Sequence, residues 1–279
     1  MRKYISIILV SVIALIVWLP MWMLMSGSLM AVDEIKTAFG PVLMETKGLA
    51  SWPLFPKYPT IRPYVELLLD SPEFFAMFWN SVKLVVPILI GQVLIAIPAA
   101  WGFARFNFKG KKLLFTLYIT LMLMPFQVTM VPHYLVLDQM NLLNTRWAVI
   151  LPGIFSTFPV FIMYRFFKAI PEAMLEAVAI DGAGHFRAFY YIGMPLGIPG
   201  VMAALVLGFL EYWNMLEQPL TFLQDKSLWP LSLYLPNIGI DNIGVSITAS
   251  VIMLVPALLI FLWGQNYLEA GIRVAGIKE

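Results

Sequence analysis

The sequence predicts an all-α, polytopic membrane protein, and three observations support this fold class. Of the 279 residues, 61% are hydrophobic and 12% are charged, whereas soluble domains average roughly 45–50% apolar and about 25% charged residues. Long segments without Asp, Glu, Lys or Arg recur along the chain, and Lys and Arg are distributed unequally among the loops between them. We therefore expect a single transmembrane domain over residues 1–279 with both termini in the cytoplasm.

Six charge-free windows are each long enough for a membrane-spanning helix. An ionised side chain at the bilayer centre costs at least about 2.5–3.5 kcal/mol, and a span needs about 20 residues. The windows are 4–32, 84–104, 113–137, 147–164, 188–210 and 242–268. They predict helices over about 5–28, 84–104, 113–132, 147–165, 196–214 and 245–264. The first apolar run exceeds the roughly 7–15 residues of a cleavable signal peptide, so we expect it to remain as a helix.

The basic residues predict the orientation of these helices. With the N-terminus inside, 11 of the 18 Lys and Arg residues face the cytoplasm, in agreement with the positive-inside rule. This set is Arg2, Lys3, Arg105, Lys109, Lys111, Lys112, Arg165, Lys168, Arg187, Arg273 and Lys278.

A long loop over residues 26–81 then lies on the extracytoplasmic side. Prolines at 53, 56, 59 and 63 interrupt regular structure, and the run from Pro63 to Trp79 is expected to form one or two interfacial helices. The aromatic residues of the loop are assigned to the headgroup region rather than to a ligand. They are Trp52, Phe74, Phe75, Phe78 and Trp79.

The cytoplasmic loop over residues 168–195 is expected to contain a short helix. Glu172 lies in its first turn, where a negative charge is favourable, and Gly182 ends it in a left-handed or strained conformation. Asp181 is unfavourable near a helix C-terminus, so it is expected to N-cap the helix that restarts near His185, or to contact a partner. A surface hairpin of two helices without a partner is the alternative.

The order of residues in this loop resembles the EAA loop of importer-type ABC permeases. The string EAVAIDGAG begins at Glu176 and includes Gly182, and Ile192 and Pro195 follow at family-like positions, with Val178 in place of the second Ala. From about Phe74 to the C-terminus the chain is also similar to the carbohydrate branch of these permeases, in particular to the smaller membrane subunit of maltose-type importers.

The resemblance implies a type I ABC importer transmembrane fold that carries a sugar and has a coupling helix seated on an ATPase subunit. It assigns ATPase-coupling roles to Glu172, Ala173, Glu176, Ala177, Asp181, Gly182 and Ala183. It further implies a second permease of different sequence, two ATP-binding subunits and an extracytoplasmic solute-binding protein. The location implied is the lipid of a prokaryotic cytoplasmic (inner) membrane.

The sequence favours a transport subunit over an enzyme. A P-loop requires Gly-Lys followed by Ser or Thr, but Gly110-Lys111 is followed by Lys112, so ATP and magnesium are expected on partner subunits. Two histidines and no cysteine predict no metal site, and no catalytic residue is assigned. The net charge of +2 does not indicate nucleic acid.

Polar residues near membrane depth are candidates for a transport path, because such groups are costly unless they face water or partners. They are Gln127, Glu211, Trp213 and Asn214. An equally weighted alternative is that Gln127 and Asn214 hydrogen-bond between helices while Trp213 lies in the interfacial belt.

Two rival classes remain for comparison. A secondary transporter would carry buried carboxylates near the midplane of several spans, for which Glu211 alone is thin support. A membrane enzyme would need an acid–base pair or metal ligands. Within sugar import, the cargo stays open among oligosaccharides, monosaccharides and phosphorylated polyols.

Overall fold

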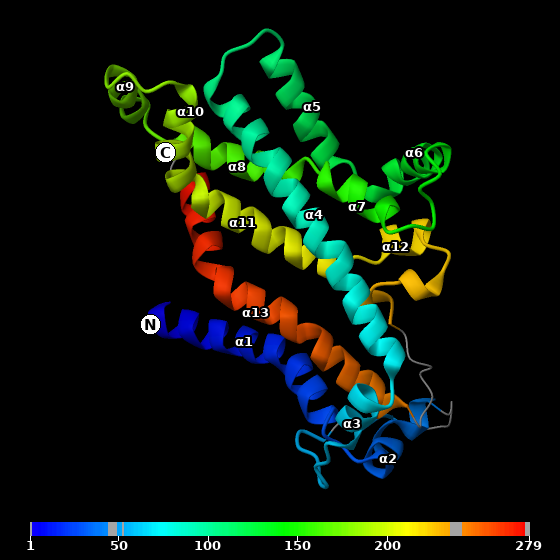
Figure 1. Cartoon of the computed structure of the whole chain (residues 1–279). Coiled ribbons are helices and arrows are strands. Elements are labelled where there is room, and N and C mark those ends of the chain that lie inside the picture. Colours follow the sequence, from blue (N-terminus) through cyan, green and yellow to red (C-terminus); the bar gives the residue numbers. More distant parts are fainter. Residues whose placement is uncertain (1, 44–48, 52, 235–241, 277–279) are drawn as a thin grey trace. The chain divides into compact units, whose positions relative to one another are not determined.

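A computed structural model describes residues 2–43, 49–51, 53–234 and 242–276 (Figure 1). These residues form helices joined by loops, and no strand occurs among them. Five helices are long and apolar enough to cross a membrane, and a sixth span results if one bent pair is counted as one. The predicted all-α polytopic fold is therefore confirmed. The chain divides into two compact units, Met1–Ala76 with Tyr234–Pro256, and Met77–Leu233 with Ala257–Glu279.

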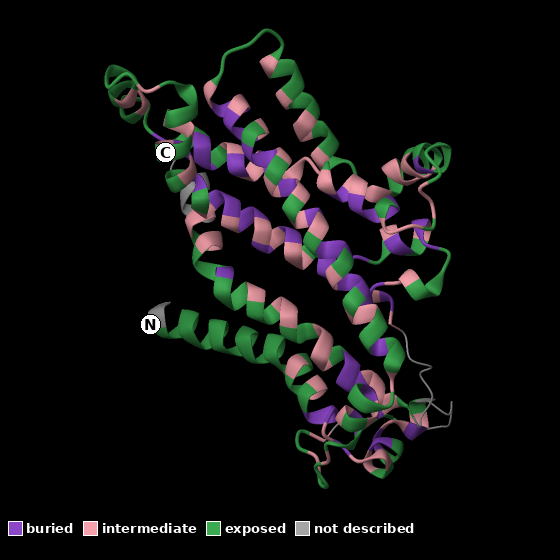
Figure 2. Ribbon diagram, viewed as in Figure 1, coloured by how far each residue is buried: buried purple, intermediate pink, exposed green. Residues whose placement is uncertain are grey.

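The first unit contains a long exposed helix and a small buried core. Its helices are α1 (Arg2–Gly27), α2 (Val32–Leu43), α3 (Arg62–Leu69), the start of α4 (Pro72–Arg105) and the first part of α13 (Ile243–Gly276). The apolar side chains of α1 are exposed along most of its length (Figure 2), whereas Met30, Ile35 and Leu67 are fully buried. Loop 26–81 thus contains helix α2, which the sequence did not predict. It also contains α3 and the start of α4, in the run where one or two helices were expected. Trp52 lies outside the described residues.

The second unit contains the remaining helices, together with α4 from Met77 onward and α13 from Ala257 onward. Helix α4 as a whole begins with Pro72 and Glu73 and ends at Arg105. A proline at the first position, an acid in the first turn and a base in the last turn all favour a helix with these ends. The others are α5 (Lys111–Leu123), α6 (Phe126–Gln139), α7 (Trp147–Ile154), α8 (Phe158–Ala169), α9 (Glu172–Ile180), α10 (His185–Ala188), a π-helical segment (Phe189–Gly193), α11 (Met194–Trp213) and α12 (Glu217–Phe222).

Two predicted spans are interrupted, and prolines explain both interruptions. The helix expected over 113–132 is bent by 104° between α5 and α6, because Pro125 disfavours the helical region for Met124, whose ψ is 122°. The helix expected over 147–165 is interrupted between α7 and α8. Pro159 would clash with the carbonyl of Phe155 in a continuous helix.

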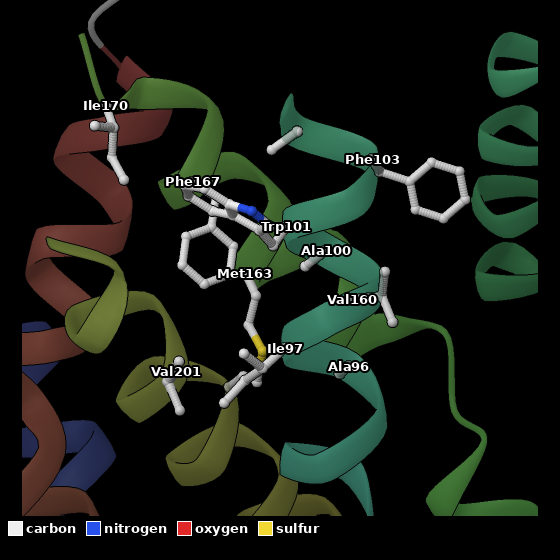
Figure 3. Close-up of a cluster of buried hydrophobic side chains, with 12 residues drawn as sticks. Ala96, Ile97, Ala100, Trp101, Phe103, Val160, Met163, Phe167, Ile170 and Val201 are labelled. Atoms are coloured by element: carbon white, nitrogen blue, oxygen red, sulfur yellow. The ribbon is translucent and has the colours of Figure 1, made fainter. Parts of the chain in front are cut away.

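The main core of the second unit is formed by α4, α8 and α11. Ala96, Ala100 and Trp101 of α4 pack with residues of α8 and α11 such as Met163 and Val201 (Figure 3). Because the core reaches Phe167 and Ile170 at the C-terminal end of α8, it fixes the point from which the next segment of chain departs.

Candidate functional site

The segment 168–195, called here the coupling segment, projects a helix with no buried residue. Helix α9 begins at Glu172 after Pro171, within one residue of the predicted start. Its side chains are mostly exposed (Figure 2), and Ile180 and Phe186 are 86% and 80% exposed. A partner that docks on this segment would cover these apolar side chains.

The end of α9 has the backbone geometry that the sequence predicts. Gly182 has φ +77°, and a side chain there would meet no atom within 4 Å. The constraint at this position is therefore conformational rather than steric, since L-residues rarely adopt positive φ. Ala183 N donates to Val178 O at 3.1 Å and closes the turn.

The prediction that Asp181 N-caps the following helix is wrong. Asp181 is the C-cap of α9, and Gly184 is the N-cap of α10, with no side-chain cap hydrogen bond. The turn at Gly182 places two residues between Asp181 and the N-cap, so the carboxylate stays exposed beside the helix end. A contact of Asp181 with a partner stays a prediction.

Two consecutive residues, Arg105 at the end of α4 and Phe106 after it, contact the chain on either side of α9. Arg105 Nη2 donates to Phe167 O at 2.6 Å and to Ile170 O at 2.5 Å, two carbonyls at the C-terminal end of α8, and Phe167 O also accepts from Ile170 N at 3.4 Å. The Phe106 ring lies 5.5 Å from the His185 ring at the start of α10, edge to face. Together these contacts fix where α9 leaves the helical core and where the chain returns.

A second feature is a cavity of about 440 Å³ in the same unit. Of the four predicted path residues, Glu211 lines it, together with Tyr212, His133, Gln218 and Ser156. The wall is formed by parts of α5, α6, α7, α8, α11 and α12. The cavity can therefore hold a small polar molecule among several helices.

The other three predicted path residues do not line this cavity. Gln127 Nε2 donates to Glu217 Oε1 at 2.5 Å, and Asn214 Nδ2 donates to Leu210 O of its own helix at 2.8 Å. Trp213 is 4% exposed and stacks on Phe209 with ring centroids 5.3 Å apart. Of the four residues, Glu211 thus lines the cavity, whereas Gln127, Asn214 and Trp213 contact other groups of the protein.

Sequence reasoning missed a buried polar network beside the cavity. Gln92 Nε2 of α4 donates to Gly153 O at 2.8 Å and to Tyr212 Oη at 3.1 Å, and the Tyr212 hydroxyl donates to Gly153 O at 3.3 Å. Gln92 is a polar side chain inside a predicted span, which is the pattern that singles out functional or packing positions. That pattern identifies Gln92, but it does not show that Tyr212 is its partner.

Metal binding receives no support from the described side chains. Among them, no group of three or more His, Cys, Asp or Glu residues lies close enough together to hold a metal ion.

The chain is similar to known proteins over most of its length. The sequence pattern of the family described as "Binding-protein-dependent transport system inner membrane component" matches residues 92–274. The arabinooligosaccharides transport system permease protein AraQ of Halalkalibacterium halodurans is 27% identical over 226 residues, covering 80% of this chain and 81% of that protein. The diacetylchitobiose uptake system permease protein NgcG of Streptomyces coelicolor is 32% identical over 206 residues, covering 71% of this chain and 66% of that protein.

A solved structure has the same fold. A chain in the crystal structure of a bacterial ABC transporter involved in the import of the acidic polysaccharide alginate matches with a TM-score of 0.76 and 16% identity, covering 95% of this chain and 96% of that chain.

Proposed function

The chain belongs to the family of binding-protein-dependent transport system inner membrane components, the permease subunits of ABC importers, and we propose that it forms half of the translocation path for a sugar or oligosaccharide. Three relatives are each named for the transport of a saccharide: AraQ, NgcG and the lactose transport system permease protein LacG of Rhizobium radiobacter. These names support a saccharide cargo. The location proposed is the prokaryotic cytoplasmic membrane.

The observation that carries the proposal is the exposed helix α9. Its sequence resembles the EAA loop, its end is defined by the positive φ of Gly182, and its base is held by Arg105. A helix that is mostly exposed and packs on the helical core through Leu175 is suited to transmit a push or pull from a docked partner. The coupling residues proposed are Glu172, Ala173, Glu176, Ala177, Asp181, Gly182 and Ala183.

The proposed assembly contains this chain, a second permease of different sequence, two ATP-binding subunits and an extracytoplasmic solute-binding protein. ATP and magnesium would bind to the ATP-binding subunits, because this sequence lacks a P-loop. For the sugar path we retain Gln127, Glu211, Trp213 and Asn214. Glu211 has the strongest support, since it lines the cavity, whereas the other three can act by holding its surroundings in place.

Hydrolysis by the purified chain and by the full complex provides the test. The chain alone should show no ATPase activity, and the reconstituted complex should hydrolyse ATP in a way that is stimulated by the sugar-loaded binding protein. Vanadate-sensitive hydrolysis by the isolated chain, measured as phosphate release, would contradict the division of labour proposed for the subunits.

A further inference from the structure

The cavity lies where three interruptions of helical structure meet. Met124 lies at the bend between α5 and α6, and Phe155 lies in the break between α7 and α8. Glu211 in the last turn of α11 and Gln218 in α12 flank the third interruption. Irregular backbone at membrane depth is tolerated where it is buried in protein or lines a polar cavity, and interrupted helices are a common setting for substrate sites.

Several polar atoms of the cavity wall have no partner within the described residues. His133 Nδ1 and Gln218 Oε1 are buried without a hydrogen bond, whereas the Glu211 carboxylate, which has no described hydrogen bond or salt bridge, is exposed to the cavity. Buried polar atoms without a partner are costly. Hydroxyl groups of a ligand, which both donate and accept, would satisfy His133 Nδ1 in either tautomer and donate to Gln218 Oε1 and to the Glu211 carboxylate.

The wall combines these acceptors with aromatic rings. Phe126, Phe155 and Phe158 line the cavity together with Thr129, so apolar ring faces lie beside hydroxyl, amide and carboxylate groups. Saccharides present hydroxyl groups at their edges and apolar C–H faces, which match such a wall. The volume of about 440 Å³ lies within the ordinary range of small-molecule sites, about 300–1,000 Å³.

The charge of the wall restricts which saccharide fits. Glu211 is the one acidic residue of the described lining, and no Lys or Arg is among the lining residues. Glu211 is exposed, so solvent screens part of its charge. A carboxylate on the ligand would nevertheless face the Glu211 carboxylate with no cation of the lining to offset the repulsion.

We propose that this cavity is a subsite for a neutral, hydroxyl-rich saccharide, in which Glu211 accepts hydrogen bonds from sugar hydroxyls and rejects saccharides that carry carboxylates. The inference rests on the proposed function and names the cargo class of the same path. It separates this chain from its structural neighbour, whose importer takes an acidic polysaccharide.

Direct binding to the purified membrane complex, prepared without the binding protein, tests the subsite. Saturation-transfer NMR is recorded with arabinotriose, lactose, diacetylchitobiose and maltotriose as neutral probes and with trimannuronate as the acidic probe. At least one neutral probe should bind to the wild type, and trimannuronate should not. Glu211→Gln should weaken neutral binding about tenfold, because hydrogen bonds to a charged acceptor are stronger than those to a neutral one, and Gln218→Ala should weaken it severalfold.

Asp138→Asn is the matched control, since Asp138 is an exposed acid of α6 outside the cavity lining, and it should bind like the wild type. Each variant complex is quantified by gel filtration. Equal binding of trimannuronate, or wild-type affinity in both Glu211→Gln and Gln218→Ala, would overturn the subsite.

Saccharide uptake by cells that lack the chain separates failure of the subsite from failure of the importer proposal. If these cells lose uptake of a neutral saccharide but no saccharide binds to this cavity, the importer proposal stands and the subsite is rejected. Unchanged uptake of every saccharide rejects the importer proposal itself, and the subsite with it.

Discussion

We expect single residues at the two ends of α9 to determine how a docked ATPase moves the membrane helices. Gly182 supplies a backbone conformation that other residues adopt only with strain. Arg105 connects the end of α4 to the end of α8 through two hydrogen bonds. Neither residue lines the cavity beside Glu211, so both are expected to affect coupling rather than cargo binding.

The first prediction concerns Gly182. Gly182→Leu should leave the chain inserted in the membrane but reduce sugar-stimulated ATP hydrolysis by the reconstituted complex roughly 5–30-fold, because the left-handed conformation costs about 1–2 kcal/mol. Glu176→Lys should act more mildly, since the exposed carboxylate contributes to docking and little to folding.

Two control substitutions at other glycines distinguish the effect of backbone strain from the effect of changing any residue in the same loop. Gly184 has φ −71°, so Gly184→Ala should retain activity. Gly110 has φ +84° in a different cytoplasmic loop, so Gly110→Ala introduces similar strain away from α9 and should keep the ATPase bound in a pull-down. Wild-type transport by Gly182→Leu would reject the assignment of the coupling segment.

The second prediction concerns Arg105. Arg105→Met removes the guanidinium donor from the Ile170 carbonyl and leaves Phe167 O with the longer bond from Ile170 N, at a cost of about 1–3 kcal/mol, and should loosen the base of α9. We expect more ATP hydrolysed per sugar transported, with assembly preserved and partial recovery in Arg105→Lys. Lys112→Met changes an exposed lysine nearby in the chain and should keep the wild-type ratio of ATP hydrolysed to sugar transported. If this ratio is unchanged in Arg105→Met, Arg105 has no role in coupling.

At the level of elements, the packing of α8 against α11 carries the coupling segment. The two helices approach closely because α11 has a glycine opposite an aromatic ring of α8: a Cβ at Gly197 would lie 2.2 Å from Phe167 Cε1. Phe167 is fully buried and also packs on Trp101 of α4, with ring centroids 5.4 Å apart. Phe167 therefore joins α4, α8 and α11 at one side chain, close to the point where α9 leaves the core.

The third prediction tests this contact. Gly197→Ala should destabilise the chain by about 1–3 kcal/mol, the usual cost of overpacking, measured as a lower Tm in detergent. Gly102→Ala is the control, because a Cβ there meets no atom within 4 Å, and it should leave Tm unchanged or slightly raised. Phe167→Leu should recover part of the loss when combined with Gly197→Ala; additive destabilisation would show that the two residues do not share this contact.

At the level of the whole molecule, the unequal distribution of Lys and Arg sets the expected topology, with loop 26–81 outside and the coupling segment inside. The exposed apolar surface of α1 (Figure 2) fits contact with lipid or with the companion permease. An outer face formed by loop 26–81 would be available to the solute-binding protein.

The fourth prediction tests this topology. The chain contains no cysteine, so single cysteines can be labelled without background. Lys57→Cys should react with an impermeant thiol reagent in intact cells or spheroplasts, and Lys109→Cys only after lysis; both positions are exposed. The opposite labelling pattern would reverse the orientation.

The sequence by itself determined the fold class and the approximate positions of the apolar helices, because charge-free windows and prolines are local features that need no knowledge of packing. It also predicted the left-handed turn at Gly182, which the structure has. The coupling role of this loop was inferred from its resemblance to the EAA loop and stays a prediction. Only the tertiary structure decided which polar residues meet. Glu211, His133 and Gln218 come from three separate helices, and their convergence depends on the bend at Pro125 and on how each helix is rotated about its axis. The sequence also did not predict that Trp213 packs in an aromatic cluster or that Arg105 donates to carbonyls of α8. Long-range packing decides which face of a helix is covered. In spans that are apolar on all sides, the residue pattern does not specify that face.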